Sequence, residues 1–135
     1  MLIHKELTEQ IIGAAIEVHR ALGPGLLESA YEECLCHELA LRGLEFKRQV
    51  PVPVRYKGVQ LDCAYRIDVL LQDSVIIEIK SVEHLTAICE AQLLTYMKIT
   101  STPVGLLINF NTPFLKTGIV RKVLKEVLPA SASPL

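Results

Sequence analysis

The sequence lacks tryptophan and has few aromatic residues of any kind, with four tyrosines and three phenylalanines among 135 residues. It also lacks a long apolar run, since no stretch approaches the roughly 18 residues that a membrane-spanning helix needs. The net charge of −1 argues against a protein that coats nucleic acid by electrostatics alone, because such proteins are strongly basic. The first residues show no apolar segment followed by a cleavage site, so we expect a cytoplasmic protein without a membrane partner.

The four cysteines, Cys34, Cys36, Cys63 and Cys89, lack the spacing of a metal site. One residue separates the first two, whereas structural zinc pairs usually enclose two to four. On a helix this spacing turns the two thiols about 200° apart. We interpret all four as reduced thiols, with Cys63 as a small hydrophobic residue in a strand. A cysteine-based redox or metal protein is therefore the weakest functional hypothesis.

Half of the residues are hydrophobic, and most of these are aliphatic. This composition is typical of a compact globular protein and excludes general disorder. The length suits one domain with a real core. We expect that domain to span residues 1–128, followed by a loose tail over residues 129–135.

The periodicity of the apolar residues predicts three helices, over residues 2–22, 26–41 and 86–100. Shorter apolar patterns predict strands near residues 50–55 and over 59–71, 75–81 and 103–110. Pro51 and Pro53 confine the first strand to an edge or an irregular course. Residues 119–127 fit a strand or a helix equally. The order predicts an α/β domain with a central mixed sheet flanked by helices.

Two carboxylates are spaced to meet across a predicted hairpin. If Gln72, Asp73 and Ser74 form a three-residue loop, Asp68 faces Glu78 directly, and facing residues have Cβ atoms about 4.5–5.5 Å apart. Lys80 points to the same side as Glu78, because side chains alternate along a strand. This register also gathers six aliphatic residues on the other side: Ile67, Val69, Leu71, Val75, Ile77 and Ile79. A two-residue loop would separate the carboxylates onto different faces.

Paired carboxylates among aliphatic side chains repel each other, and burial adds to the cost. A divalent cation removes this repulsion, and Mg²⁺ or Mn²⁺ suits oxygen ligands. Lys80 is placed to position a nucleophilic water or to neutralise charge in the transition state. The pattern therefore predicts a metal-dependent hydrolytic site at Asp68, Glu78 and Lys80.

Two helical pairs accompany these residues. Glu28 and Tyr31 lie three residues apart on the second predicted helix, and Gln92 and Tyr96 lie four apart on the third. Each pair places a polar group beside a hydroxyl. A first-turn acid, a half-buried tyrosine and a surface glutamine explain them about as well as a functional role does.

The order of these motifs resembles the small bacterial GxxExxY proteins. Residues 25–31, GLLESAY, match the signature that names the family, and Asp68, Glu78-Ile79-Lys80, residues 92–96 (QLLTY) and residues 105–110 (GLLINF) follow in the family's order. The resemblance extends from about the first helix to residue 127. This family is similar to the PD-(D/E)xK nuclease superfamily, with its α-β-β-β-α-β core. The predicted elements match this core with one additional N-terminal helix.

The resemblance implies roles for individual residues. It implies that Asp68 and Glu78 bind Mg²⁺ or Mn²⁺ together with the carbonyl of Ile79. Lys80 is implied as the catalytic lysine and Glu28 as an accessory acid. Residues 92–96 match the Q-x-x-x-Y motif of RecB-like nucleases, which implies that Gln92 and Tyr96 seat the nucleic-acid backbone. Tyr31 is expected to help position the substrate. The superfamily's Pro-Asp stands here as Ile67-Asp68.

The leading hypothesis is a metal-dependent nuclease, with DNA favoured over RNA as its substrate. The alternative is a non-catalytic module that keeps the nuclease fold and binds a partner in a DNA-processing or defence assembly. The oligomeric state is open, and both a homodimer and a complex with a partner protein are compatible with the apolar content.

Overall fold

The computed structural model describes residues 4–61 and 65–124, which form one five-stranded sheet covered by helices on both faces. The helices are α1 (Lys5–Leu22), α2 (Glu28–Leu41) and α3 (Ala87–Thr100), with a short 3-10 helix η1 (Leu115–Gly118). The strands are β1 (Phe46–Pro51), β4 (Arg66–Leu71), β5 (Val75–Lys80), β6 (Val104–Asn109) and β7 (Ile119–Val123), and a separate hairpin contains β2 (Arg55–Tyr56) and β3 (Val59–Gln60). None of the helices in these ranges is long and apolar enough to cross a membrane.

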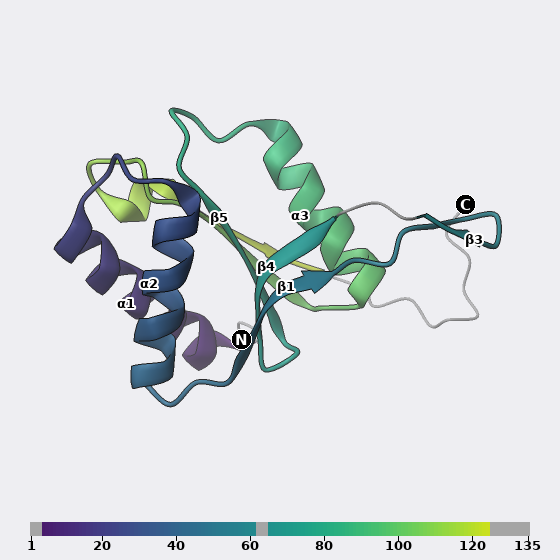
Figure 1. Cartoon of the computed structure of the whole chain (residues 1–135), viewed down its shortest axis with the longest axis horizontal. Coiled ribbons are helices and arrows are strands. Elements are labelled where there is room, and N and C mark those ends of the chain that lie inside the picture. Colours follow the sequence, from purple (N-terminus) through teal and green to yellow (C-terminus); the bar gives the residue numbers. More distant parts are fainter. Residues whose placement is uncertain (1–3, 62–64, 125–135) are drawn as a thin grey trace.

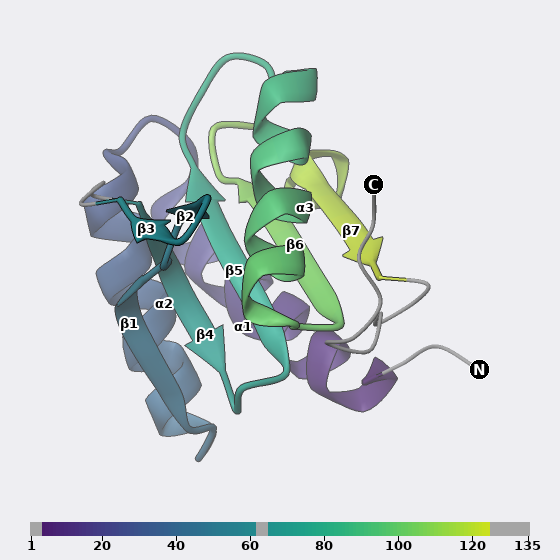
Figure 2. The ribbon, with the colours of Figure 1, turned by 90° about the vertical axis from the view of Figure 1, so that its right-hand side faces the viewer.

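The sheet has the order β1-β4-β5-β6-β7 and is mixed, because β5 and β6 run parallel while the other neighbours are antiparallel. The parallel pair needs a crossover connection, which α3 provides. In Figure 2, α3 lies in front of the sheet, with α1 and α2 behind it. The predicted mixed sheet flanked by helices is confirmed.

Each face of the sheet has its own core. On the α1–α2 side, Ile11, Leu35 and Phe110 pack with aliphatic residues of β4, β5 and β6. On the α3 side, Leu93 and Met97 pack against Ile76 of β5 and neighbouring residues. All six residues of β6 are buried, as expected for a central strand covered on both faces.

Most predicted elements are found within a few residues of their expected ends. Thr86 begins α3 by accepting a hydrogen bond from the Cys89 amide, as an N-cap residue does. The strand predicted near residues 50–55 lies at the sheet edge, as expected, but it spans Phe46–Pro51, so Pro53 lies outside it. The ambiguous segment near the C-terminus is a strand over Ile119–Val123.

One predicted strand is wrong, because the structure has two separate strands in its place. A single strand over residues 59–71 was expected, but β3 ends at Gln60 and β4 begins at Arg66, while Leu61 and Tyr65 belong to neither. Pairing explains the division, because β3 bonds only to β2, whereas β4 bonds to β1 and β5. Residues 62–64, with Cys63, lie outside the described residues, as does the predicted tail.

The predicted three-residue hairpin loop is confirmed. Leu71 pairs with Val75 and Val69 pairs with Ile77, the register that the sequence favours. Ile67, however, packs with the α3-side core instead of joining Val69 and Leu71 on the other face. The side chains of β4 therefore stop alternating regularly between the two faces at Asp68. This residue lies beside Gln49, whose φ of 50° is left-handed. The pairing of β1 with β4 omits these two residues and resumes on both sides of them.

A buried asparagine fixes the chain that leaves β5. Asn109 is only 2% exposed, and its side chain accepts a hydrogen bond from the Val82 amide (3.1 Å) and donates one to the Val82 carbonyl (2.9 Å). The same oxygen accepts from the Asn111 amide. The segment that follows Lys80 is therefore held against the end of β6.

We expect Asn109→Ala to lower the free energy of unfolding by about 2–3 kcal/mol, because the two Val82 backbone groups lose their partner in a half-buried place. Urea unfolding followed by circular dichroism measures this loss. The matched control is Asn111→Ala, which removes a side chain with no hydrogen bond to the described residues. Equal losses in the two variants would contradict the role of Asn109.

Candidate nuclease active site

Asp68 and Glu78 come together where β4 and β5 separate. Antiparallel partners in this hairpin keep a constant register, so the position after the Val69–Ile77 pair places Asp68 opposite Glu78. The Cα pairing ends at Val69 and Ile77, and beyond it Asp68 Oδ2 accepts a hydrogen bond from the Ile79 amide at 2.8 Å. A side chain thus takes the place of the next ladder hydrogen bond, and the sheet opens at this point.

The opening turns the carbonyl of Ile79 toward Asp68. Backbone groups alternate sides along a strand, and the N–H and C=O of one residue point the same way. The Lys80 carbonyl accepts the Phe110 amide (2.9 Å), so Lys80 bonds toward β6. Ile79 bonds toward β4, as its contact with Asp68 confirms. Three oxygen groups therefore face this opening, from Asp68, Glu78 and the Ile79 backbone.

Glu78 is a buried acid in an unfavourable electrostatic environment. Its side chain lies on the α3 side of the sheet, and the residue is 5% exposed. Burial, followed by the charge of Asp68, raises the pKa of Glu78 to about 9, against the opposing effect of Lys80. Its Oε1 atom is buried without a hydrogen-bond partner in the described part of the chain. This unpartnered oxygen favours a cation at the site, which would restore the ionised form.

A family model for the PD-(D/E)XK nuclease superfamily matches residues 5–122. The chain belongs to this superfamily. Glu78-Ile79-Lys80 matches the (D/E)-X-K letters of the name, and the mixed sheet with helices on both faces is consistent with the superfamily's fold. Searches of curated proteins and of solved structures found no match.

The candidate metal ligands of this PD-(D/E)XK domain are few. Among residues 4–61 and 65–124, no cluster of three or more His, Cys, Asp or Glu side chains is arranged to hold a metal. Two carboxylates and one carbonyl suit Mg²⁺, which keeps several waters and takes one or two carboxylates from the protein. The buried thiol of Cys36 does not compete as a ligand, because burial raises its pKa to about 11.

Glu28 reaches the site through the backbone that follows Lys80. It is the first residue of α2, and its Oε2 atom accepts a hydrogen bond from the Ser81 amide at 3.2 Å. The Ser81 hydroxyl donates to the Leu26 carbonyl at 2.6 Å. Both bonds tie the start of α2 to the end of β5. Glu28, the expected accessory acid, therefore contacts the residue that directly follows Lys80, the expected catalytic lysine.

Tyr31 is placed differently from Glu28. The side chain is fully buried and stacks on Phe110, with ring centroids 4.5 Å apart. Its hydroxyl donates to the Gly23 carbonyl and accepts from the Leu26 amide. The structure therefore does not bring Tyr31 to a surface that substrate could touch, because its hydroxyl already holds the Gly23–Leu26 loop.

Tyr96 lies beside the acidic pair, on the buried face of α3. Burial, and then the charge of Glu78, raises the pKa of Tyr96, so its hydroxyl stays protonated as a hydrogen-bond donor. The Tyr96 ring contacts the Tyr65 ring edge-on, with ring centroids 6.4 Å apart. Gln92 is half-buried one turn earlier, on the same side of α3.

Sequence reasoning missed a polar network behind Asp68. Glu32 of α2 is 8% exposed and accepts two hydrogen bonds from Arg48, at 2.8 and 3.1 Å. The Gln49 amide nitrogen donates to Glu32 Oε1 at 2.7 Å and lies 3.4 Å from Asp68 Oδ1. Gln49 thus links the Glu32–Arg48 ion pair to Asp68, the candidate metal ligand.

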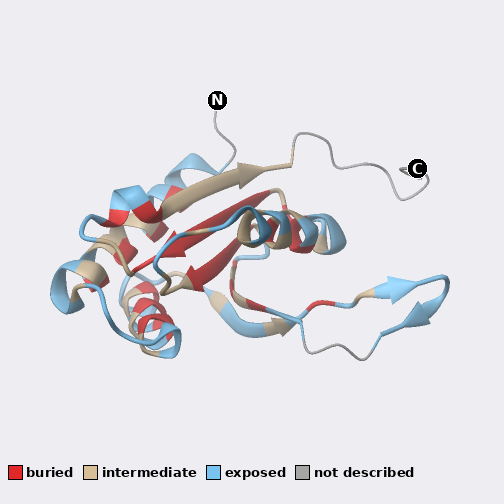
Figure 3. Cartoon of the chain, turned by 90° about the horizontal axis from the view of Figure 1, so that it is seen from above, coloured by how far each residue is buried: buried red, intermediate tan, exposed pale blue. Residues whose placement is uncertain are grey.

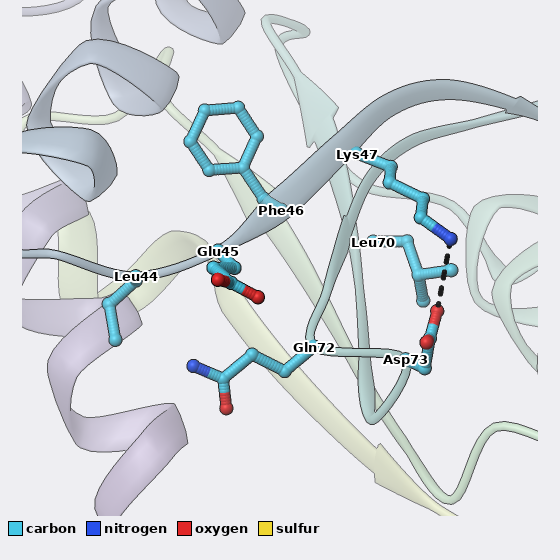
Figure 4. A pocket seen from close by; sticks show the side chains of 7 residues that line it. All are labelled: Leu44, Glu45, Phe46, Lys47, Leu70, Gln72 and Asp73. Carbon is cyan, nitrogen blue, oxygen red and sulfur yellow. Dashed lines mark ion pairs between the residues drawn. The ribbon is translucent and has the colours of Figure 1, made fainter.

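The hollow in Figure 4 lies at the other end of the hairpin. Leu44, Lys47 and Asp73 are among the residues that line it, and Lys47 pairs with Asp73 at 3.7 Å. No residue of the candidate site lines this hollow. We therefore place the candidate active site at the opposite end of β4 and β5, where the acids converge.

The raised pKa of Glu78 predicts a pH-dependent stability of the metal-free protein. In the unfolded chain a glutamate ionises near pH 4.5, whereas folded Glu78 ionises near 9. Between these values the folded state binds one more proton, so stability falls as pH rises across this window. Glu78→Gln removes the buried charge and should raise the melting temperature at pH 8–9 in the presence of chelator, with the gain vanishing near pH 4.5.

Thermal melts at several pH values measure this effect. Glu83→Gln is the control, because the Glu83 side chain is 92% exposed and its loss should leave the pH profile unchanged. If the melting temperatures of wild type and Glu78→Gln changed with pH in parallel, the pKa of Glu78 would not be raised in the folded protein.

Proposed function

We propose that this superfamily member is a divalent-metal-dependent nuclease of the GxxExxY branch, with DNA favoured over RNA as its substrate. The observation that carries the proposal is the Asp68–Glu78 pair at an opened sheet end, with a buried carboxylate oxygen that has no protein partner. The GLLESAY segment supports the branch, and the superfamily supports nucleic acid as the substrate class.

Asp68, Glu78 and the Ile79 carbonyl would hold the Mg²⁺ or Mn²⁺ ion. When bound, such an ion supplies a Lewis acid for the scissile phosphate and lowers the pKa of water. Asp68 is preorganised for this role, because the Ile79 amide fixes one carboxylate oxygen. Glu78 is preorganised by burial in β5, where every residue but Lys80 is buried. We assign cation binding to these groups.

Lys80 lies on the same side of β5 as Glu78 and is half-buried. Its ammonium group would stabilise the negative charge that develops on the phosphate and orient the attacking water. Glu28 acts beside it as the accessory acid through the Ser81 amide. Gln92 and the Tyr96 hydroxyl would donate hydrogen bonds to the nucleic-acid backbone. We assign Tyr31 an indirect role in substrate positioning, through the Gly23–Leu26 loop that it holds.

We expect Asp68→Ala and Lys80→Ala each to lower Mn²⁺- or Mg²⁺-dependent cleavage by about a hundredfold or more, since each removes charge stabilisation that acts on the transition state. A gel assay on single- and double-stranded DNA and on RNA measures this loss. Lys98→Ala, an exposed lysine at the far end of α3, is the control. Undiminished cleavage by both site variants, with normal circular dichroism, would refute the assigned site.

Gln49→Ala should weaken Mn²⁺ binding by about tenfold or more, because groups that orient a metal ligand typically affect metal affinity by this amount. Isothermal titration calorimetry measures the affinity without reference to turnover. Gln72→Ala is a matched control, because Gln72 also has a left-handed φ of 50° but lies at the hairpin loop, away from the site. The same weakening in both variants would assign the effect to backbone conformation.

A further inference from the structure

A small hairpin projects from the domain and is not explained by the fold or the catalytic residues. It consists of β2, β3 and their two-residue turn, residues 55–60, which we call the basic arm. All six residues are exposed, and the two strands pair only with each other. Figure 3 shows the arm in pale blue, extending away from the buried sheet. It adds little to the core, so its exposure needs another explanation.

The arm is built by defined local geometry and is anchored at its base. Arg55 pairs with Gln60, and the turn residues Lys57 and Gly58 have φ values of 48° and 81°. Consecutive left-handed residues are typical of a tight two-residue hairpin turn. At the base, the Leu61 amide donates to the Val54 carbonyl at 2.8 Å. Val52, which precedes the arm, is buried in the α3-side core and bonds to Tyr65. The arm therefore projects from the domain, while its base is fixed by hydrogen bonds and by packing in the core.

The arm concentrates positive charge in a protein of net charge −1. No Asp or Glu stands between Glu45 and Asp62 in the sequence. The two basic residues that precede the arm, in β1, are already neutralised by ion pairs, with Asp73 and Glu32. Arg55 and Lys57, in contrast, have no ion pair with any residue in the described ranges. Within the part of the chain that the structure describes, no carboxylate therefore offsets their charge.

The position of the arm relates it to the candidate active site. It lies on the same side of the sheet as α3, opposite α1 and α2 (Figure 1). At its base, Tyr65 precedes β4, the strand that carries Asp68, and the Tyr65 ring contacts Tyr96 of α3. Tyr65 therefore connects the base of the arm to Tyr96, which lies beside the acidic pair.

We propose that the basic arm clamps the phosphate backbone of the nucleic acid that enters this site. This inference rests on the proposed function. Arg55 and Lys57 neutralise backbone phosphates outside the cleaved bond, which counteracts the repulsion that Asp68 and Glu78 exert on a polyanion. The exposed ring of Tyr56, over which the Lys57 ammonium lies at 5.3 Å, offers a face for a base or sugar. Charge complementarity favours a nucleic acid over an apolar protein partner.

Salt-dependent binding tests the clamp independently of catalysis. Fluorescence anisotropy with a labelled DNA duplex in EDTA compares wild type, Arg55→Ala/Lys57→Ala and the control Lys5→Ala/Lys98→Ala. The control loses the same charge at the opposite end of the sheet, since Lys5 lies near Gln72 and Ser74. We expect the arm variant to bind about tenfold or more weakly at 0.1 M salt, and its log–log salt slope to fall by about two, because each phosphate contact contributes about 0.9.

Equal affinities and slopes for the arm variant and the control would overturn the clamp, as would absence of DNA binding by wild type. Arg55→Glu/Lys57→Glu provides a second variant that should weaken binding further. Hydrolysis of a small phosphodiester, bis(4-nitrophenyl) phosphate, should be unchanged in the arm variants, because such a substrate does not reach the arm. Failure of wild type to cleave any nucleic acid with Mg²⁺ or Mn²⁺ refutes the proposed function, whereas the anisotropy experiment alone decides the clamp.

Discussion

The hydrogen bond from the Ile79 amide to Asp68 is the contact on which the geometry of the site depends. Opening two paired strands normally leaves backbone groups without partners, and such groups are costly when buried. Here a carboxylate satisfies the Ile79 amide at the point where β4 and β5 separate, so this donor keeps a partner in the opened sheet. The same bond holds Asp68 opposite Glu78, while β5 stays paired with β6 as far as Lys80. One interaction therefore creates the opening and orients the acids around it.

Glu78 shows what this arrangement costs in the absence of a cation. A carboxyl group with a pKa near 9 gives up its ordinary charge in the folded state. The surrounding β5 residues are aliphatic and buried, and their packing offsets an unfavourable group in the same strand. Proteins commonly retain such local conflicts at functional sites, because the chemistry needs them. The network of Glu32, Arg48 and Gln49 contributes from the other side by orienting Asp68.

Much of this site could be predicted from the sequence, because the hairpin that carries it is local. The alternation of aliphatic residues and the three polar turn residues fit one register, and the structure has that register. The irregularity at Asp68 could not be predicted, since it depends on Gln49 of β1 and a left-handed backbone angle. The two-residue strands β2 and β3 are too short to produce a periodic pattern. The burial of Tyr31 was also hidden, because its partner Phe110 is distant in sequence.

The contacts of residues 25–31, GLLESAY, explain how this segment is related to the candidate site. Tyr31 holds the loop before α2 through Gly23 and Leu26, and Leu26 and Glu28 in turn bind Ser81. On the other side, Asn109 binds both backbone groups of Val82. The two residues that follow Lys80 are thus fixed from α2 and from β6. Because Lys80 ends a rigid strand and is followed by two anchored residues, its backbone has little freedom to move. The contacts of this segment therefore restrain the backbone beside Lys80, and Glu28 is its one charged residue.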